Sequence, residues 1–103
     1  MLPIERFKIE DKSMEPTLRH GDYVLVNKLA YVFGKPAKGD MIVLKHPKEK
    51  NKLLIKRISA VRNSDEYFVV GDNKNYSKDS RHFGSIDKDL IIGKVFVHVK
   101  RSR

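Results

Sequence analysis

Short runs in which polar and apolar residues alternate recur along the chain and predict β-strands. Alternation places successive side chains on opposite faces of a sheet. Glycine-containing turn signals such as His20-Gly21-Asp22 separate the runs, and only a short turn at 87–90 suggests anything helical. The predicted strands are residues 6–10, 22–28, 41–45, 53–61, 66–70 and 90–99. Several short strands at this spacing predict a mostly β fold, a coiled sheet or partly open barrel.

Length and composition narrow the picture further. A chain of 103 residues has room for one small domain, so we expect residues 1–103 to form a single unit. The absence of cysteine excludes a disulfide scaffold, a thiol nucleophile and a zinc-thiolate site. No apolar run approaches the roughly 20 residues that span a bilayer, and residues 1–10 lack a signal-peptide core. We therefore expect a soluble, cytoplasmic protein, with an extracytoplasmic or membrane-associated location left open.

The net charge of +9 favours anionic partners, either nucleic acid or an anionic membrane surface. The simpler interpretation is that lysines solvate a small surface. The lysine-rich segment 45–52 contains Pro47 and lies between two predicted strands, so we interpret it as a solvated hairpin loop. A phosphate or lipid contact there is the alternative.

The first candidate for chemistry is Ser13, in the segment 12–18 (KSMEPTL). A serine at a strand end, followed by a proline turn, can expose both its hydroxyl and its backbone N–H. That pairing allows nucleophilic attack and oxyanion stabilisation from one residue. Alone the signal is weak, because a serine before such a turn is usually only a turn residue.

A serine nucleophile needs a base, and Lys56 is the unusual candidate. It lies inside the apolar run 53–58 (LLIKRI), where lost hydration would favour the neutral amine and lower its pKa. Strand alternation alone would also allow Lys56 to face water. The histidines show no Ser-His-Asp order and no metal-ligand spacing, so we interpret them as structural or exposed and expect no metal or cofactor; they are His20, His46, His82 and His98.

The polar segment 71–84 (GDNKNYSKDSRHFG) is the third candidate element. Asp79, with Arg81 and Arg57, could form a charge-assisted network that fixes this loop against the strand of the candidate lysine. Ser77 could then donate or accept a hydrogen bond that aims the amine.

Three motifs together resemble signal peptidase I: 13–18 (SMEPTL), the pair Lys56-Arg57, and the long pattern GDN-x-x-x-S-x-D-S-R within 71–84. The motifs and the intervening Gly-Asp pairs cover most of the chain from residue 7 to residue 99. The resemblance implies a serine endopeptidase with a Ser/Lys dyad on a mostly β coiled-sheet domain.

The resemblance also implies a role for individual residues. Ser13 would match the nucleophile, Lys56 the general base, and Ser77 the hydroxyl that orients the lysine. Met14 would match a position that packs near the catalytic centre. The structural ion-pair network beside the site would comprise Arg57, Asp79 and Arg81.

The sequence departs from the family pattern in several places. The family usually has Gly or Ser-Gly before the nucleophile, whereas this chain has Asp11-Lys12. The oxyanion would therefore depend mainly on the Ser13 N–H, and the Asp11 carboxylate would oppose developing negative charge. The Gly-Leu-Pro-Gly-Asp segment that typically follows Lys-Arg, the second β domain and the membrane anchor are not in this sequence.

One branch of the family, the nickel-type superoxide dismutase maturation proteases, is the most similar. The compact spacing from Gly39-Asp40 to Lys56-Arg57 and the segment 79–84 (DSRHFG) resemble it. The implied partner is a precursor protein, from which a short N-terminal leader is removed. General processing of secretory signal peptides is the alternative within the family.

Other classes compete with these interpretations. A LexA-type self-cleaving protease also uses Ser and Lys, but it lacks the 79–81 (DSR) pattern, and this chain shows no helix-turn-helix. A basic β-barrel that binds single-stranded nucleic acid would explain the charge, yet such modules need exposed aromatic platforms. Most of the aromatic residues here fall in apolar alternation, so we expect no specific nucleic acid. A degenerate protease that only binds peptides is the third rival.

Overall fold

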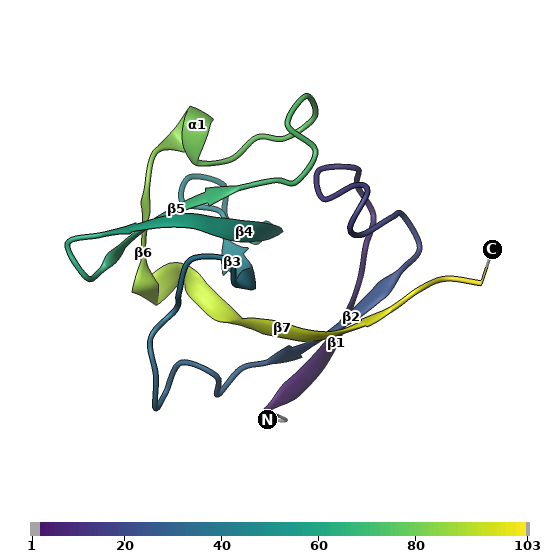
Figure 1. Ribbon diagram of the computed structural model, residues 1–103, viewed down its shortest axis with the longest axis horizontal. Helices are drawn as coiled ribbons and strands as arrows, with labels where there is room; N and C mark the ends of the chain where they lie inside the picture. The colour runs from purple at the N-terminus through teal and green to yellow at the C-terminus, as the bar shows by residue number, and fades with distance from the viewer. Residues whose placement is uncertain (1–2, 103) are drawn as a thin grey trace.

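The computed structural model describes residues 3–102, most of which build one antiparallel sheet (Figure 1). A one-turn helix and a 3-10 turn interrupt the strands near the C-terminal end. The elements are β1 (Ile4–Lys8), β2 (Tyr23–Asn27), β3 (Met41–Lys45), β4 (Leu53–Arg62), β5 (Glu66–Val70), α1 (Ser80–Phe83), β6 (Ile86–Asp87), η1 (Lys88–Leu90) and β7 (Ile91–Val99).

The strand order is β1-β2-β7-β3-β4-β5-β6, with every neighbouring pair antiparallel. The last strand, β7, lies between β2 and β3, so the C-terminal part of the chain pairs with strands from its first half. Register shifts interrupt three of the strand pairs, and such bulges increase local twist. The sheet curls into a half-barrel (Figure 1), which confirms the predicted mostly β, partly open architecture.

Two apolar clusters cover the two faces of the central strand β3, whose middle residues are all buried. The first, here called the β4–β5 cluster, comprises Ile42, Leu44, Leu54, Ile58, Tyr67, Val69 and Ile86. The second, here called the loop cluster, comprises Ile9, Met14, Leu18, Val24, Val26 and Val43. Because Ile9, Met14 and Leu18 belong to the second cluster, burial of apolar area holds the loop between β1 and β2 against the sheet.

The predicted strands agree with the structure at 41–45 and 66–70, and three others differ by one residue at one or both ends. The first strand, predicted at 6–10, was wrong by two residues at each end. The strand begins at Ile4 and ends at Lys8, because Ile9 turns inward and its N–H donates to the Asp22 carbonyl.

Two small elements were missing from the sequence prediction, β6 and α1. The helix is one turn long, and a capping box starts it: the Asp79 side chain accepts from backbone N–H groups while the His82 side chain accepts from the Asp79 N–H. The predicted turn at 87–90 is present as η1.

Within residues 3–102, the helices are too short or too polar to cross a bilayer. The expectation of no signal-peptide core covered residues 1–10, of which Met1 and Leu2 lie outside the described residues.

Candidate active site

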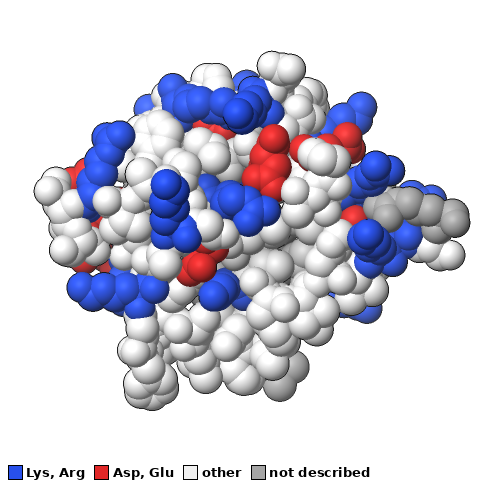
Figure 2. All heavy atoms as spheres, viewed as in Figure 1, with Lys and Arg blue, Asp and Glu red and all other residues white. Residues whose placement is uncertain are grey.

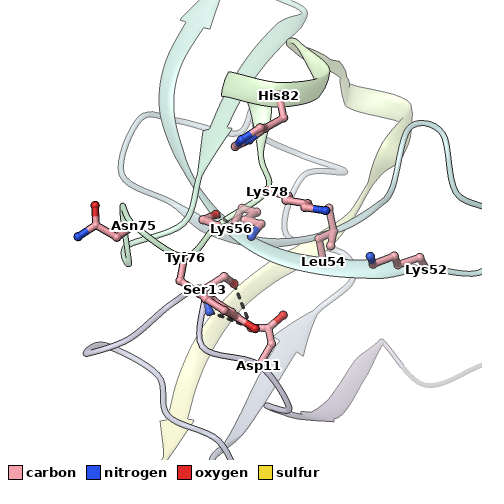
Figure 3. A pocket seen from close by; sticks show the side chains of 10 residues that line it. Asp11, Ser13, Lys52, Leu54, Lys56, Asn75, Tyr76, Lys78 and His82 are labelled. Carbon is pink, nitrogen blue, oxygen red and sulfur yellow. Dashed lines mark hydrogen bonds between the residues drawn. The ribbon is translucent and has the colours of Figure 1, made fainter.

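Ser13 lies in the tight loop between β1 and β2, and the residue is 5% exposed. The next residue, Met14, is 1% exposed, and together with Leu18 it fixes the loop in the loop cluster. The Leu18 N–H donates to the Met14 carbonyl across this turn. Ser13 is therefore held beside an apolar anchor, with its hydroxyl directed into a cavity (Figure 3).

The Asp11 carboxylate is the hydrogen-bond partner of Ser13. Asp11 Oδ1 accepts from the Ser13 backbone N–H at 3.1 Å and from the Ser13 hydroxyl at 3.0 Å (Figure 3). Sequence reasoning marked Asp11 as a departure that opposes negative charge, and the structure places its carboxylate directly on the N–H expected to hold the oxyanion.

Lys56 lies on the buried face of β4, between Leu54 and Ile58 of the β4–β5 cluster, and is 2% exposed. Its Nζ donates to Ser77 Oγ at 3.0 Å. Burial lowers the pKa of Lys56 below its ordinary value, and the Asp11 and Asp79 carboxylates oppose that lowering. Of the two orientations that alternation allowed, the buried one is present.

Ser77 connects the lysine to the fully buried carboxylate of Asp79. The Ser77 hydroxyl donates to Asp79 Oδ2 at 2.7 Å, and the Gly71 N–H donates to the same oxygen at 2.9 Å. Arg81 completes the set with hydrogen bonds of 2.9 and 2.7 Å to the two carboxylate oxygens. Burial acts to raise the pKa of Asp79, but the hydrogen bonds from Arg81, Gly71 and Ser77 hold it well below the ordinary value.

Arg57 does not join that network, so the predicted group of Arg57, Asp79 and Arg81 was wrong in this respect. Arg57 instead makes a bidentate pair with Asp72, at 2.9 and 2.8 Å. Neighbouring residues of a strand face opposite sides of the sheet. Lys56 points toward Asp79, whereas Arg57 points to the side of the loop cluster. The hydrogen bond from Arg57 lowers the pKa of Asp72, and burial opposes it.

The loop after β5 is also tied directly to the loop of Ser13. The Asn73 N–H donates to the Ser13 carbonyl at 2.8 Å, and its side-chain amide donates to the Lys12 carbonyl at 3.0 Å. The Thr17 hydroxyl donates to Asp72 at 2.6 Å, and the Asp72 N–H contacts Met14 Sδ at 3.4 Å. These bonds set the position of Ser13 relative to Ser77.

In the sequence Gly71 is the first residue of the polar segment 71–84, and the structure shows a packing reason for a glycine there. A Cβ at this position would overlap Ser77 Oγ and the Ser13 carbonyl oxygen. The backbone at Gly71 thus fits between the two loops. A signal for this lay in the sequence, since glycine is the residue that permits such close approach.

A cavity of about 480 Å³ brings the candidates together (Figure 3). Its residues come from the loop before β2, from β4 and the residue before it, from the loop after β5 and from α1. The lining residues are Asp11, Ser13, Lys52, Leu54, Lys56, Asn75, Tyr76, Ser77, Lys78 and His82. Met14, Arg57, Asp79 and Arg81 are not among these lining residues. The cavity offers a hydroxyl and an amine to a chain that enters it.

The histidines bear on which base is available. His20 contacts the Glu10 carbonyl, His46 contacts Glu49, and His98 contacts Asp22. His82 lines the cavity, but its Nδ1 accepts from the Asp79 N–H, and Lys56 lies between it and Ser13 in Figure 3. The described residues contain no cluster of three or more His, Cys, Asp or Glu suited to a metal ion.

Comparison with known proteins gives consistent matches. The family model described as signal peptidase, peptidase S26 matches residues 1–62 and 63–100. Signal peptidase I of Aquifex aeolicus is 49% identical over 73 residues, covering 69% of this chain and 28% of that protein. Signal peptidase I of Pseudomonas aeruginosa is 33% identical over 104 residues, covering 87% of this chain and 34% of that protein.

A plant protein matches over a larger share of its own length. The mitochondrial ATP-independent inner membrane protease subunit 1b of Arabidopsis thaliana is 34% identical over 109 residues, covering 84% of this chain and 64% of that protein. The chain thus spans about a third of the two bacterial relatives and under two thirds of the plant one.

Proposed function

Because the chain belongs to the signal peptidase family, peptidase S26, we propose that it is a serine endopeptidase that removes an N-terminal leader from a precursor protein. The observation that carries the proposal is the shared cavity of Ser13 and Lys56, in which a buried amine is held by Ser77 beside an otherwise apolar strand face. A buried lysine is costly to the fold, and a role as a base accounts for its position.

In the proposed mechanism, neutral Lys56 takes the Ser13 hydroxyl proton as the oxygen attacks the scissile carbonyl. The Ser13 N–H then donates to the oxyanion of the tetrahedral intermediate. Lys56 passes its proton to the leaving amine, and the acyl-enzyme forms. Lys56 then takes a proton from water as the water oxygen attacks the acyl-enzyme, and it returns that proton to the departing Ser13 oxygen.

Ser77 and Asp79 act as positioning residues in this scheme. Ser77 donates its own proton to Asp79, so its lone pairs face Lys56 and hold the amine in place. Asp79 stays ionised because Arg81 and the Gly71 N–H stabilise its charge. Ser77 thus orients the Lys56 amine, and the Asp79 carboxylate is hydrogen-bonded to Ser77 rather than to the amine.

For the substrate, we propose the precursor of a nickel-type superoxide dismutase, supported by the compact spacing of the motifs in this chain. Nickel belongs to that substrate and not to this protein. General processing of secretory signal peptides is the second candidate, favoured by relatives named signal peptidase I.

The test is intact-mass spectrometry after incubation with each of the two precursors. The expected result is one loss of the leader, absent in Ser13→Ala and in Lys56→Ala. Ser85→Ala and Lys8→Ala serve as matched controls, because both residues lie outside the cavity. Cleavage of only the secretory precursor would mean that the protein processes secretory signal peptides in general and not the dismutase precursor. No cleavage of either would favour the peptide-binding alternative.

We also propose peripheral contact with an anionic bilayer. The segment between β2 and β3 exposes Phe33 at 95%, Val32 at 60% and Leu29 at 52%, and three lysines flank it at 28, 35 and 38. In Figure 2 the lower part of the face, where this segment lies, shows few charged side chains. An apolar projection with the exposed lysines 35 and 38 beside it, on a chain of net charge +9, suits the interface of an anionic membrane.

A nucleic-acid-binding module has weaker support. Phe33, Tyr76 and Phe96 are exposed, as stacking platforms for bases would have to be, and the other aromatic residues are buried or half-buried. Tyr76, however, lines the cavity of Ser13 and Lys56, where a peptide is the better fit.

A further inference from the structure

Asp11 occupies both groups of Ser13 that acyl transfer requires. Its Oδ1 accepts the backbone N–H at 3.1 Å and the hydroxyl at 3.0 Å. While the hydroxyl proton is directed to Asp11, it is not directed to Lys56. While the N–H is directed to a carboxylate, it is not available to an oxyanion. The same carboxyl oxygen thus competes with two steps of the reaction.

The charge of Asp11 acts on the base as well. Its carboxylate favours the protonated, inactive form of Lys56. Asp79 acts in the same direction, but its charge is already shared with Arg81. The cationic groups that oppose them are Arg81 and Lys52, and the other titratable groups lining the cavity are Tyr76, Lys78 and His82. Asp11 is the carboxylate in this set that contacts the nucleophile.

We propose that Asp11 is a positioning residue that restrains the nucleophile: its carboxylate holds Ser13 in a resting arrangement, and the scissile carbonyl must displace it before attack. This inference rests on the proposed proteolytic function. It follows that Asp11 limits the rate near neutral pH, and that its removal activates the enzyme.

The kinetic test compares Asp11→Asn and Asp11→Ala with the wild-type chain across pH 6 to 10, on the precursor that the wild type cleaves. Asp11→Asn keeps the size but removes the charge, so the alkaline limb of kcat/KM moves to lower pH and kcat/KM at pH 7 rises about three- to tenfold. Asp11→Ala also frees the Ser13 N–H and raises the alkaline plateau. Glu10→Gln, which removes one negative charge from the adjacent exposed residue, is the matched control and leaves the profile in place.

Two kinetic outcomes overturn the proposal. A fall in kcat of several orders of magnitude in both variants would make Asp11 a promoter of attack. If the pH profiles of both Asp11 variants were identical to that of Glu10→Gln, Asp11 would act only as one more surface charge and would not restrain Ser13.

A second measurement keeps this inference separate from the proposed function. Amide hydrogen exchange at Ser13 reports the contact itself, and it accelerates about tenfold in Asp11→Ala if the carboxylate holds the N–H. The Asn73 N–H, bonded to the Ser13 carbonyl, is the internal reference and stays protected. Unchanged exchange at Ser13 overturns the restraint. Faster exchange without cleavage of any precursor would instead refute the proteolytic function and with it the catalytic consequence of the restraint.

Discussion

Lys56 and Ser77 meet at 3.0 Å, amine to hydroxyl, although 21 positions separate them in the chain. The Ser77 hydroxyl in turn donates a hydrogen bond of 2.7 Å to Asp79. The Asp79 carboxylate also accepts hydrogen bonds from Arg81 and from the Gly71 N–H. The Lys56 amine, on a residue that is only 2% exposed, therefore has a fixed neighbour that accepts a hydrogen bond. This pairing supplies orientation, and the strand face supplies the lowered pKa.

Ser77→Ala should lower kcat by about 10- to 100-fold, the range expected for loss of one aimed hydrogen bond in a buried site. KM should change little, because Ser77 orients the base and is not expected to bind the peptide. Steady-state kinetics on the cleaved precursor measure both constants. Ser85→Ala removes an exposed hydroxyl that bonds Glu66 and should have no effect. A rise in KM at constant kcat would contradict the orienting role.

Activity should rise with pH, because only the neutral form of Lys56 accepts the Ser13 proton. Burial lowers the lysine pKa, so the rising limb should lie below the ordinary value of about 10.4. The measurement is kcat/KM from pH 6 to 10, with circular dichroism as a check that the fold persists. A flat profile would remove Lys56 as the titrating base.

Lys56→Met should inactivate the enzyme yet stabilise the fold near neutral pH by on the order of 1 kcal/mol. A lowered lysine pKa means that the unfolded chain binds more protons than the native one between the native pKa and about 10.4, so native stability rises with pH in that window. Methionine removes this dependence. Urea unfolding at pH 7 and pH 9 should show a pH-dependent difference for the wild type that is smaller in the variant. Equal pH dependence in both proteins would show that Lys56 is not the group responsible.

The strands could be predicted because each leaves a local signal, whereas Ser13 and Ser77 became candidates mainly through the resemblance to a family pattern. Alternation marks a strand, and a lysine inside the apolar run 53–58 stands out by its chemistry. The alternation does not predict which face of β4 is buried, because burial depends on how β5 and the loop after it pack against the strand. The buried orientation of Lys56 is a property of the assembled sheet.

Two contacts of the site could not be predicted from the local sequence pattern. Arg57 was expected to pair with Asp79, but as the neighbour of Lys56 it faces the other side of the sheet and reaches Asp72. The hold of Asp11 on Ser13 depends on the backbone path of two turn residues. Both outcomes are set by where a side chain points, which residue types alone do not specify.

Phe33→Ser should weaken binding to vesicles that contain anionic lipid. Replacing a phenylalanine that is 95% exposed removes apolar area available to the bilayer without opening the core. Co-sedimentation with vesicles of phosphatidylserine and phosphatidylcholine measures the bound fraction, and about a threefold loss or more is expected. Tyr76→Ser, which removes an exposed aromatic side chain at the cavity, is the control and should bind as the wild type does. Equal binding by Phe33→Ser would exclude this segment as the membrane contact.

Gly71→Ala should abolish most of the activity, because a Cβ there overlaps Ser77 Oγ and the Ser13 carbonyl oxygen. Accommodating the methyl group requires the loop after β5 to move away from the Ser13 loop, which separates Ser77 from Lys56. We expect a fall in kcat/KM of about 100-fold or more and a loss of stability of about 1–3 kcal/mol, the range for overpacking. Gly34→Ala is the matched control, because the nearest atom to its added Cβ is the Ala30 carbonyl oxygen at 3.9 Å. Urea unfolding and cleavage assays on both variants check the prediction. A fully active Gly71→Ala enzyme would mean that the two loops tolerate separation, and that Ser77 does not need its present position to serve the lysine.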